Sequence, residues 1–203
     1  MKQATGWGIA MNVYTYEGAS FWILFYVWFA LEMSLWIRAR LLRRGQPRKR
    51  NDDRGSAVLI MLGMYVLIFI SIGFSIRQEG ILPRWTQYIG FVLMIAGIVI
   101  RLSAIIQLGR FFSPVVGVVS NQEIVQTGLY RWIRHPAYTG GWITAVGIGF
   151  GLRTWWGVLL CGIGLLLIYA YRIRVEEKVL VEHFGERYVE YRKRTRRMFP
   201  GIW

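Results

Sequence analysis

The chain has 203 residues, of which 55% are hydrophobic, and its formal net charge is +14 at pH 7. The length suits one domain, and the hydrophobic fraction is too high for a soluble protein of average composition. A single cysteine excludes an intramolecular disulfide and a cysteine-type metal site. The hydrophobic residues form long uncharged blocks, so the composition indicates membrane spans.

Five apolar blocks approach the roughly 20 residues that a helix needs to cross a bilayer. They are residues 20–37, 57–76, 85–106, 138–152 and 154–172. The sequence therefore predicts an all-α, polytopic integral membrane protein with about five transmembrane helices. We expect one membrane domain, with three spans and a basic loop in 1–106 and a helical core in 107–203. The first block starts late and no small-residue cleavage site follows it, so we do not expect a signal peptide.

Only Arg153 separates the fourth block from the fifth, which begins at Thr154, so the two blocks predict a tight helical hairpin. Pro136 suits the first position of the fourth helix, because its missing N–H has no partner there in any case. Small residues recur at helix-packing spacing, such as Gly147 with Gly151. We interpret this glycine run as a packing surface and not as a nucleotide loop, since no strand precedes it.

Basic residues are concentrated on one side of the predicted spans. Residues 38–54 hold eight Lys or Arg and 172–197 hold nine, whereas the opposite side holds four. Such residues favour cytoplasmic loops, which predicts an N-terminus outside and a C-terminus in the cytoplasm. Residues 107–137 then also lie on the cytoplasmic side. We interpret the charge as a topology signal and an attraction for anionic lipid, and expect no nucleic-acid partner.

Few side chains inside the predicted spans are charged or chemically reactive. Glu32 and Arg101 are the charges within spans, and we expect them to pair and to join the first and third spans. Cys161 is expected to be a small packing residue. The two histidines, His135 and His183, do not predict a metal site. The sequence does not define an oligomeric state.

Two polar clusters lie at the cytoplasmic ends of the predicted spans. Arg134 and His135 precede the fourth span, and either hold a polar ligand or form a turn with satisfied side chains. Arg172 and Glu176 are four residues apart and share one helix face, as a boundary ion pair or as part of a site. Residues 173–198 predict a charged amphipathic helix that Gly185 bends or breaks.

Several motifs follow one another in the C-terminal half. They are Gln122-Glu123-Ile124-Val125, Gly128-Leu129-Tyr130, Arg134-His135-Pro136, Tyr138-Thr139-Gly140, Arg172 with Glu176, and Phe184-Gly185 with Tyr188 and Tyr191. In this order the chain resembles the isoprenylcysteine carboxyl methyltransferases and the related phospholipid methyltransferases. The resemblance covers residues 105–200.

The resemblance implies a small helical membrane enzyme with a cytoplasmic pocket for S-adenosylmethionine. The implied cofactor site consists of Gln122, Glu123, Ile124, Val125, Tyr130, Arg134, His135, Pro136, Ala137 and Glu176. Arg172 is implied to face the substrate, and Arg172 and Glu176 are the implied catalytic pair. Two departures bear on the substrate: Gln122-Glu123 replaces a His-Thr common in eukaryotic members, and the N-terminal half is shorter than theirs.

The implied reaction is methylation of the carboxylate of a prenylated cysteine or a similar lipidic acceptor that arrives from the bilayer. Such a carboxylate is ionised near pH 7 and needs no general base. A phospholipid amine is the alternative acceptor, and it would need a base such as His135 or Glu176. A non-catalytic membrane binder, or a reductase-like relative that binds a nicotinamide cofactor, also stays open.

Overall fold

The structure is a computed structural model that describes residues 16–42, 53, 55–113, 115–117 and 122–201. Most of these residues are helical. The helices are α2 (Tyr16–Leu42), α3 (Ser56–Ile76), α4 (Thr86–Leu108), α5 (Pro136–Gly151), α6 (Trp155–Leu159), α7 (Leu165–Phe184) and α8 (Glu186–Arg194). Within the described ranges there is no β-strand, only two isolated bridges. The all-α prediction is confirmed, while most of the predicted basic loop lies outside the described residues.

Four helical segments are long and apolar enough to cross a membrane. They are Gly18–Arg38, Ser56–Ile76, Thr86–Phe111 and Trp155–Phe184. The last is continuous through a π-helical turn, η3 (Leu160–Gly164), that joins α6 to α7. The predicted fourth span is present as α5, but α5 has only 16 residues. Its crossing therefore stays a prediction, whereas the chain is an integral membrane protein.

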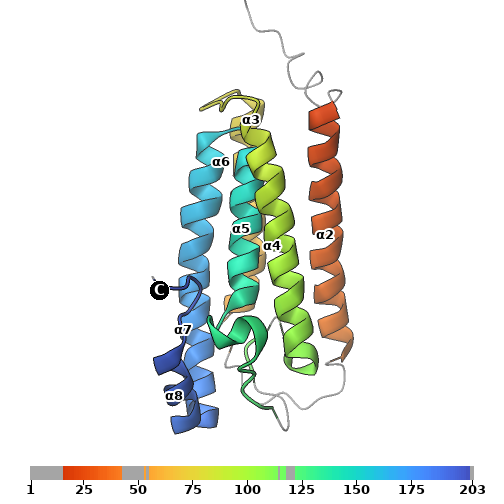
Figure 1. Cartoon of the computed structure of the whole chain (residues 1–203). Helices are drawn as coiled ribbons and strands as arrows, with labels where there is room; N and C mark the ends of the chain where they lie inside the picture. Colours follow the sequence, from red (N-terminus) through yellow and green to blue (C-terminus); the bar gives the residue numbers. More distant parts are fainter. Residues whose placement is uncertain (1–15, 43–52, 54, 114, 118–121, 202–203) are drawn as a thin grey trace, which may run out of the picture.

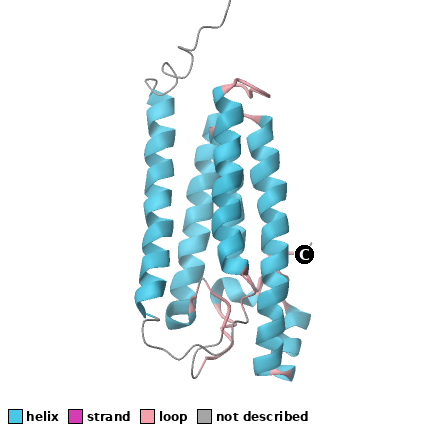
Figure 2. Ribbon diagram, turned by 180° about the vertical axis from the view of Figure 1, so that it is seen from behind, coloured by secondary structure: helices cyan, strands magenta, loops and turns pink. Residues whose placement is uncertain are grey.

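The long helices run side by side as a bundle (Figure 1). In this view α2 stands at the edge next to α4, and α5 lies between α4 and α7. One end of the bundle carries the turn between α3 and α4 and the turn before α6. The opposite end carries the last turn of α4, the first turn of α5 and all of α8. From behind, the loops again gather at the two ends of the bundle (Figure 2).

The hairpin between α5 and α6 is as tight as the sequence predicts. Arg153 takes a left-handed backbone conformation with φ of 56°, which reverses the chain within three residues. Thr154 Oγ1 donates to the Glu79 carbonyl at 2.8 Å, and the Trp155 N–H donates to the Gly80 carbonyl at 2.9 Å. This turn returns the chain to the end of the bundle where α5 began.

Glycines let the backbones of α4 and α5 touch. A Cβ added at Gly97 would lie 2.6 Å from both the Gly140 carbonyl oxygen and the Thr144 backbone nitrogen. Membrane helices that approach this closely gain dispersion contacts, because small residues remove the side chains between them. The α4–α5 contact therefore depends on glycine at this position.

Gly97→Ala is expected to destabilise the protein by about 1–3 kcal/mol, because the added methyl group overpacks a backbone contact. The matched control is Gly73→Ala in α3, where an added Cβ meets nothing within 4 Å. That change should be neutral or slightly stabilising, since alanine favours helix over glycine by about 1 kcal/mol. Thermal unfolding in detergent measures both variants, and equal midpoints would contradict the packing account.

Three further predictions about the spans are confirmed. Glu32 and Arg101 pair within the bundle, with Arg101 Nε 2.5 Å from Glu32 Oε1 and Nη2 2.8 Å from Oε2. Cys161 is buried, with its sulfur 3.7 Å from the Ser71 hydroxyl. Gly185, at φ of 57°, ends α7 and separates it from α8.

Candidate active site

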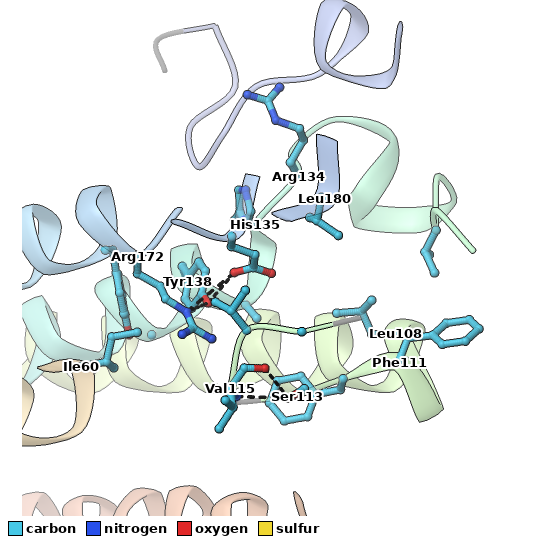
Figure 3. A pocket seen from close by; sticks show the side chains of 18 of the residues that line it. Ile60, Leu108, Phe111, Ser113, Val115, Arg134, His135, Tyr138, Arg172 and Leu180 are labelled. Carbon is cyan, nitrogen blue, oxygen red and sulfur yellow. Dashed lines mark hydrogen bonds and ion pairs between the residues drawn. The ribbon is translucent and has the colours of Figure 1, made fainter. Parts of the chain in front are cut away.

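A large pocket opens at the end of the bundle where α5 begins (Figure 3). Its volume is about 1500 Å³ when the part open to solvent is included. Ten of the eleven residues predicted for the site line it, namely Gln122, Glu123, Ile124, Val125, Tyr130, Arg134, His135, Ala137, Arg172 and Glu176. Pro136 is instead buried as the first residue of α5. The structure therefore brings together segments that are far apart in the sequence.

The lining has two chemically different parts. One, which we call the apolar wall, comes from α2 and α3 and consists of Trp28, Leu35, Trp36, Ile60, Met61 and Met64. The other, which we call the polar wall, comes from residues 122–135, α7 and α8 and includes Gln122, Glu123, Tyr130, His135, Glu176, Tyr188 and Tyr191. The pocket thus presents both an apolar surface and a hydrogen-bonding surface to a ligand.

Arg172, Tyr138 and Glu176 form a hydrogen-bonded chain inside the pocket (Figure 3). Arg172 Nε donates to the Tyr138 hydroxyl at 3.0 Å, and this hydroxyl donates to Glu176 Oε2 at 2.8 Å. The direct distance from Arg172 Nε to Glu176 Oε2 is 3.9 Å. The Arg172 side chain is 1% exposed and that of Glu176 is 29% exposed. Glu176 is therefore the more accessible of the two charges.

Asp53, which the sequence analysis did not single out, is the main ionic partner of Arg172. Its carboxylate accepts a short hydrogen bond from Arg172 Nη1. Burial raises the pKa of Asp53, but the backbone N–H groups of Ala57 and Val116 and the Arg172 charge outweigh it, so the pKa lies below its usual value. The feature of the sequence that could have identified Asp53 is its position as an acidic residue just before a predicted helix start.

Glu177 is a second acidic residue that the sequence analysis missed. Its Oε1 lies 2.8 Å from Arg134 Nε and 3.5 Å from His135 Nε2, and its Oε2 lies 3.2 Å from Arg197 Nη2. The side chains of Glu177, Arg134 and His135 are buried, and that of Arg197 is partly exposed. The feature of the sequence that could have identified Glu177 is its position directly after Glu176. Neighbouring residues of a helix point to different faces, so Glu177 cannot share the role of Glu176.

Arg134 fastens the C-terminal segment to the turn before α5. Besides Glu177, its guanidinium donates to the carbonyl oxygens of Thr195 and Arg192. The Arg134 backbone N–H also donates to the Arg196 carbonyl at 2.7 Å. In Figure 3 its side chain points away from Arg172 and Tyr138. Arg134 therefore stabilises the polar wall through contacts on the side that faces away from the pocket.

Glu177→Gln is expected to destabilise the protein by about 3–5 kcal/mol, because it leaves buried cations without their carboxylate. The matched control is Glu182→Gln on the same helix, where the exposed pair with Lys178 spans 3.8 Å. Solvent screens such a pair, so its loss should change stability little. The thermal unfolding midpoint in detergent distinguishes the two, and equal small effects would show that Glu177 does not organise the polar wall.

Three tyrosines of the polar wall can contact a ligand through their aromatic rings, but they do not act as acids or bases. The Tyr130 hydroxyl donates to the Ala104 carbonyl at 3.3 Å, and the Tyr191 hydroxyl donates to the Tyr130 carbonyl at 2.7 Å. Burial raises the pKa of Tyr130, Tyr188 and Tyr191 well above the usual value. These phenols stay neutral near pH 7 and suit contact with a flat aromatic ligand.

The sequence profile of the phospholipid methyltransferase family matches residues 85–187, which is more than half of the chain. The chain therefore belongs to the phospholipid methyltransferase family. The matched region runs from the start of α4 into α8, so it includes the Arg134-His135-Pro136 turn and both Arg172 and Glu176.

Individual relatives are protein-S-isoprenylcysteine O-methyltransferases. The one from Schizosaccharomyces pombe is 35% identical over 119 residues, which cover 58% of this chain and 50% of the relative. The one from Saccharomyces cerevisiae is 35% identical over 116 residues, covering 56% and 48%. The one from Xenopus laevis is 32% identical over 124 residues, covering 58% and 42%. The matches thus span about half the length of these curated relatives.

A solved structure shares the fold. It is that of a eukaryotic intramembrane Ras methyltransferase, an isoprenylcysteine carboxyl methyltransferase, with a TM-score of 0.66 and 22% sequence identity. The similarity covers 94% of this chain and 68% of the other. It extends over α2 and α3 as well as the family region, so the apolar wall belongs to the shared fold.

Proposed function

We propose that this protein is an S-adenosylmethionine-dependent methyltransferase that methylates the carboxylate of a prenylated cysteine or a similar lipidic acceptor. One observation carries the proposal: a single pocket joins an apolar wall to a polar wall, with Arg172 and Glu176 among its lining residues. A lipid-linked acceptor and a water-soluble methyl donor need such a combined surface. The names of the relatives support the same reaction.

The polar wall fits S-adenosylmethionine by its chemistry. This molecule supplies a methyl group bound to a positively charged sulfur, and it also carries an ammonium and an adenine ring. The partly exposed carboxylate of Glu176 suits the positive groups. The neutral rings of Tyr130, Tyr188 and Tyr191 suit the adenine. Residues 122–125 line the same pocket and offer backbone groups for hydrogen bonding.

Arg172 is proposed to hold the acceptor carboxylate. Guanidinium and carboxylate groups form charge-assisted, often bidentate hydrogen bonds. Tyr138 fixes the Nε side of the guanidinium at 3.0 Å, so the group has a defined orientation in the pocket. The lipid part of the acceptor would lie along the apolar wall and reach it sideways from the bilayer.

The protein's main task in this reaction is alignment. Methyl transfer from a sulfonium is an in-line displacement, so the nucleophile must lie behind the methyl group. The acceptor carboxylate is ionised near pH 7, and no protein base is needed. The positive charge on sulfur and the negative charge on the carboxylate are both lost as the bond forms, so a site shielded from water favours the neutral products.

A phospholipid amine is the second candidate acceptor, and Glu176 is the observation that favours it. An ammonium must lose a proton before it can attack, and Glu176 lies in the pocket as a possible base. The two acceptors differ in their need for Arg172. If the amine is the acceptor, Arg172→Ala should reduce turnover less than loss of the base does.

Binding of S-adenosylmethionine tests the enzyme class before any acceptor is known. Isothermal calorimetry on the detergent-purified protein should show saturable binding of S-adenosylmethionine and none of a reduced nicotinamide cofactor. Binding of the nicotinamide alone would support the reductase-like alternative. Binding of neither would favour a non-catalytic membrane protein and would contradict the proposal.

We also propose that the pocket faces the cytoplasm and that the N-terminus lies outside. The basic segments predicted to be cytoplasmic include 172–197, and this segment borders the pocket. In a Cys161→Ser background, Glu182→Cys should resist a membrane-impermeant maleimide in intact cells, while Glu79→Cys at the opposite end should react. The reverse pattern would overturn this orientation.

A further inference from the structure

Asp53 brings a buried carboxylate from the region just before α3 to the side of the pocket where Arg172 lies. Only 5% of Asp53 is exposed. The residue lies outside the region that matches the family profile, and far from Arg172 in the sequence. Its contact with Arg172 therefore joins the N-terminal half of the chain to the proposed acceptor site.

Backbone groups hold the Asp53 carboxylate independently of Arg172. The Ala57 N–H donates to Oδ2 at 3.0 Å, and the Val116 N–H donates to Oδ1 at 2.9 Å. The Ser56 hydroxyl donates to Oδ1 at 3.2 Å. Hydrogen bonds of this kind offset the cost of burying a charge. The carboxylate is thus a fixed point to which the Arg172 side chain is attached.

Arg172 is constrained from two directions as a result. Nη1 binds the Asp53 carboxylate and lies 2.6 Å from the Ser56 hydroxyl, while Nε binds the Tyr138 hydroxyl. A long arginine side chain otherwise keeps rotamer entropy that a ligand would have to remove. Fixing the guanidinium before the acceptor arrives removes part of that cost.

The same carboxylate also fixes part of the pocket lining. Val116 and its neighbours Val115 and Gly117 line the pocket, and Val116 donates its backbone N–H to Asp53. In Figure 3, Val115 and Ser113 lie across the pocket from Tyr138. Asp53 therefore joins three parts of the site: the start of α3, this stretch of the lining and Arg172.

We infer that Asp53 is a positioning residue, which holds the guanidinium of Arg172 in the orientation that receives the acceptor's carboxylate. The inference rests on the proposed function, in which Arg172 binds that carboxylate. Asp53 itself does not touch the acceptor. It acts through Arg172, so its loss should weaken acceptor binding and spare the methyl donor.

The test compares Asp53→Asn with wild type by steady-state methylation of a farnesylated cysteine and by calorimetry with S-adenosylmethionine. We expect the acceptor KM to rise about tenfold or more, as for directly coupled charged pairs, with the affinity for S-adenosylmethionine within about twofold of wild type. Ser56→Ala, which removes one neighbour of Arg172 and leaves the carboxylate, should raise the acceptor KM by a smaller factor. The control Glu182→Gln breaks an exposed ion pair and should change neither value.

A double-mutant cycle separates positioning from a merely structural role. If Asp53 acts through Arg172, then adding Asp53→Asn to Arg172→Lys should raise the acceptor KM much less than it does in wild type. An unchanged acceptor KM in Asp53→Asn, an equal loss of methyl-donor affinity, or a full effect in the Arg172→Lys background would each overturn the inference. A wild-type protein that makes no methyl ester would instead overturn the proposed function, and this role with it.

Discussion

Replacing Arg172 by alanine is expected to reduce the kcat/KM for a carboxylate acceptor about 100-fold or more, because a buried charged partner is lost. The same change should leave the affinity for S-adenosylmethionine nearly unchanged, since Glu176 and the tyrosines of the polar wall remain. Arg172→Lys keeps the charge but loses the planar fork, and we expect an intermediate loss. Radiolabelled methyl transfer, with calorimetry on the same preparations, measures both quantities.

Arg172→Ala also leaves Asp53 buried without its cation, so loss of folding must be distinguished from loss of recognition. Arg172→Ala combined with Asp53→Asn removes both charges and serves as the matched variant. If this pair folds and binds S-adenosylmethionine but esterifies at the wild-type rate, the role proposed for Arg172 is wrong. Full activity toward a phospholipid amine in the same variant would favour the second candidate acceptor.

Glu176→Gln is the second large expected effect. We expect the affinity for S-adenosylmethionine to fall about tenfold or more, because a hydrogen bond to a charged group contributes roughly 1.5–3 kcal/mol. Glutamine retains the size of the side chain and can still accept the Tyr138 hydroxyl bond, so the fold should be preserved. Calorimetry on the purified variant gives the affinity directly.

Glu182→Gln is the control for Glu176→Gln, since it removes the same charge from an exposed position on α7. It should bind S-adenosylmethionine as wild type does. A Glu176→Gln protein with undiminished affinity for S-adenosylmethionine, and with a wild-type unfolding midpoint, would remove Glu176 from the cofactor site. In that case the amine-acceptor candidate would retain Glu176 as a possible base.

The sequence predicted that Arg134-His135-Pro136 and the pair of Arg172 and Glu176 lie on the same side of the membrane, because a hairpin of two helices connects them. The turn at Arg153 reverses the chain, so α7 returns to the end where α5 begins. A spacing of four residues then places Arg172 and Glu176 toward the same pocket. Local patterns of this kind depend on helix geometry, which a sequence specifies well.

Asp53 and Glu177 escaped prediction because their roles depend on partners that are distant in the sequence. Asp53 meets Arg172 and Val116 only once α3, α4 and α7 have assembled. Glu177 pairs with Arg134 and Arg197 through the fold of the C-terminal segment. The local signals, an acidic residue before a helix start and a second carboxylate beside Glu176, do not identify a partner, because tertiary structure alone defines it.

The number of spans shows a similar limit. Hydropathy distinguishes α2, α3, α4 and the continuous α6–α7 segment clearly. The apolar composition of the shorter α5 predicts a span, yet two of its glycines, Gly140 and Gly147, pack directly against the backbone of α4. Whether a helix of this kind crosses a bilayer depends on its neighbours as much as on its own residues.

The central claim is tested most directly by methyl transfer from radiolabelled S-adenosylmethionine, catalysed by the detergent-purified protein with a farnesylated cysteine as acceptor. Our account predicts a labelled product that releases methanol in base, because a methyl ester is base-labile. A base-stable product on a phospholipid amine, or saturable S-adenosylmethionine binding without any ester, would contradict carboxylate methylation.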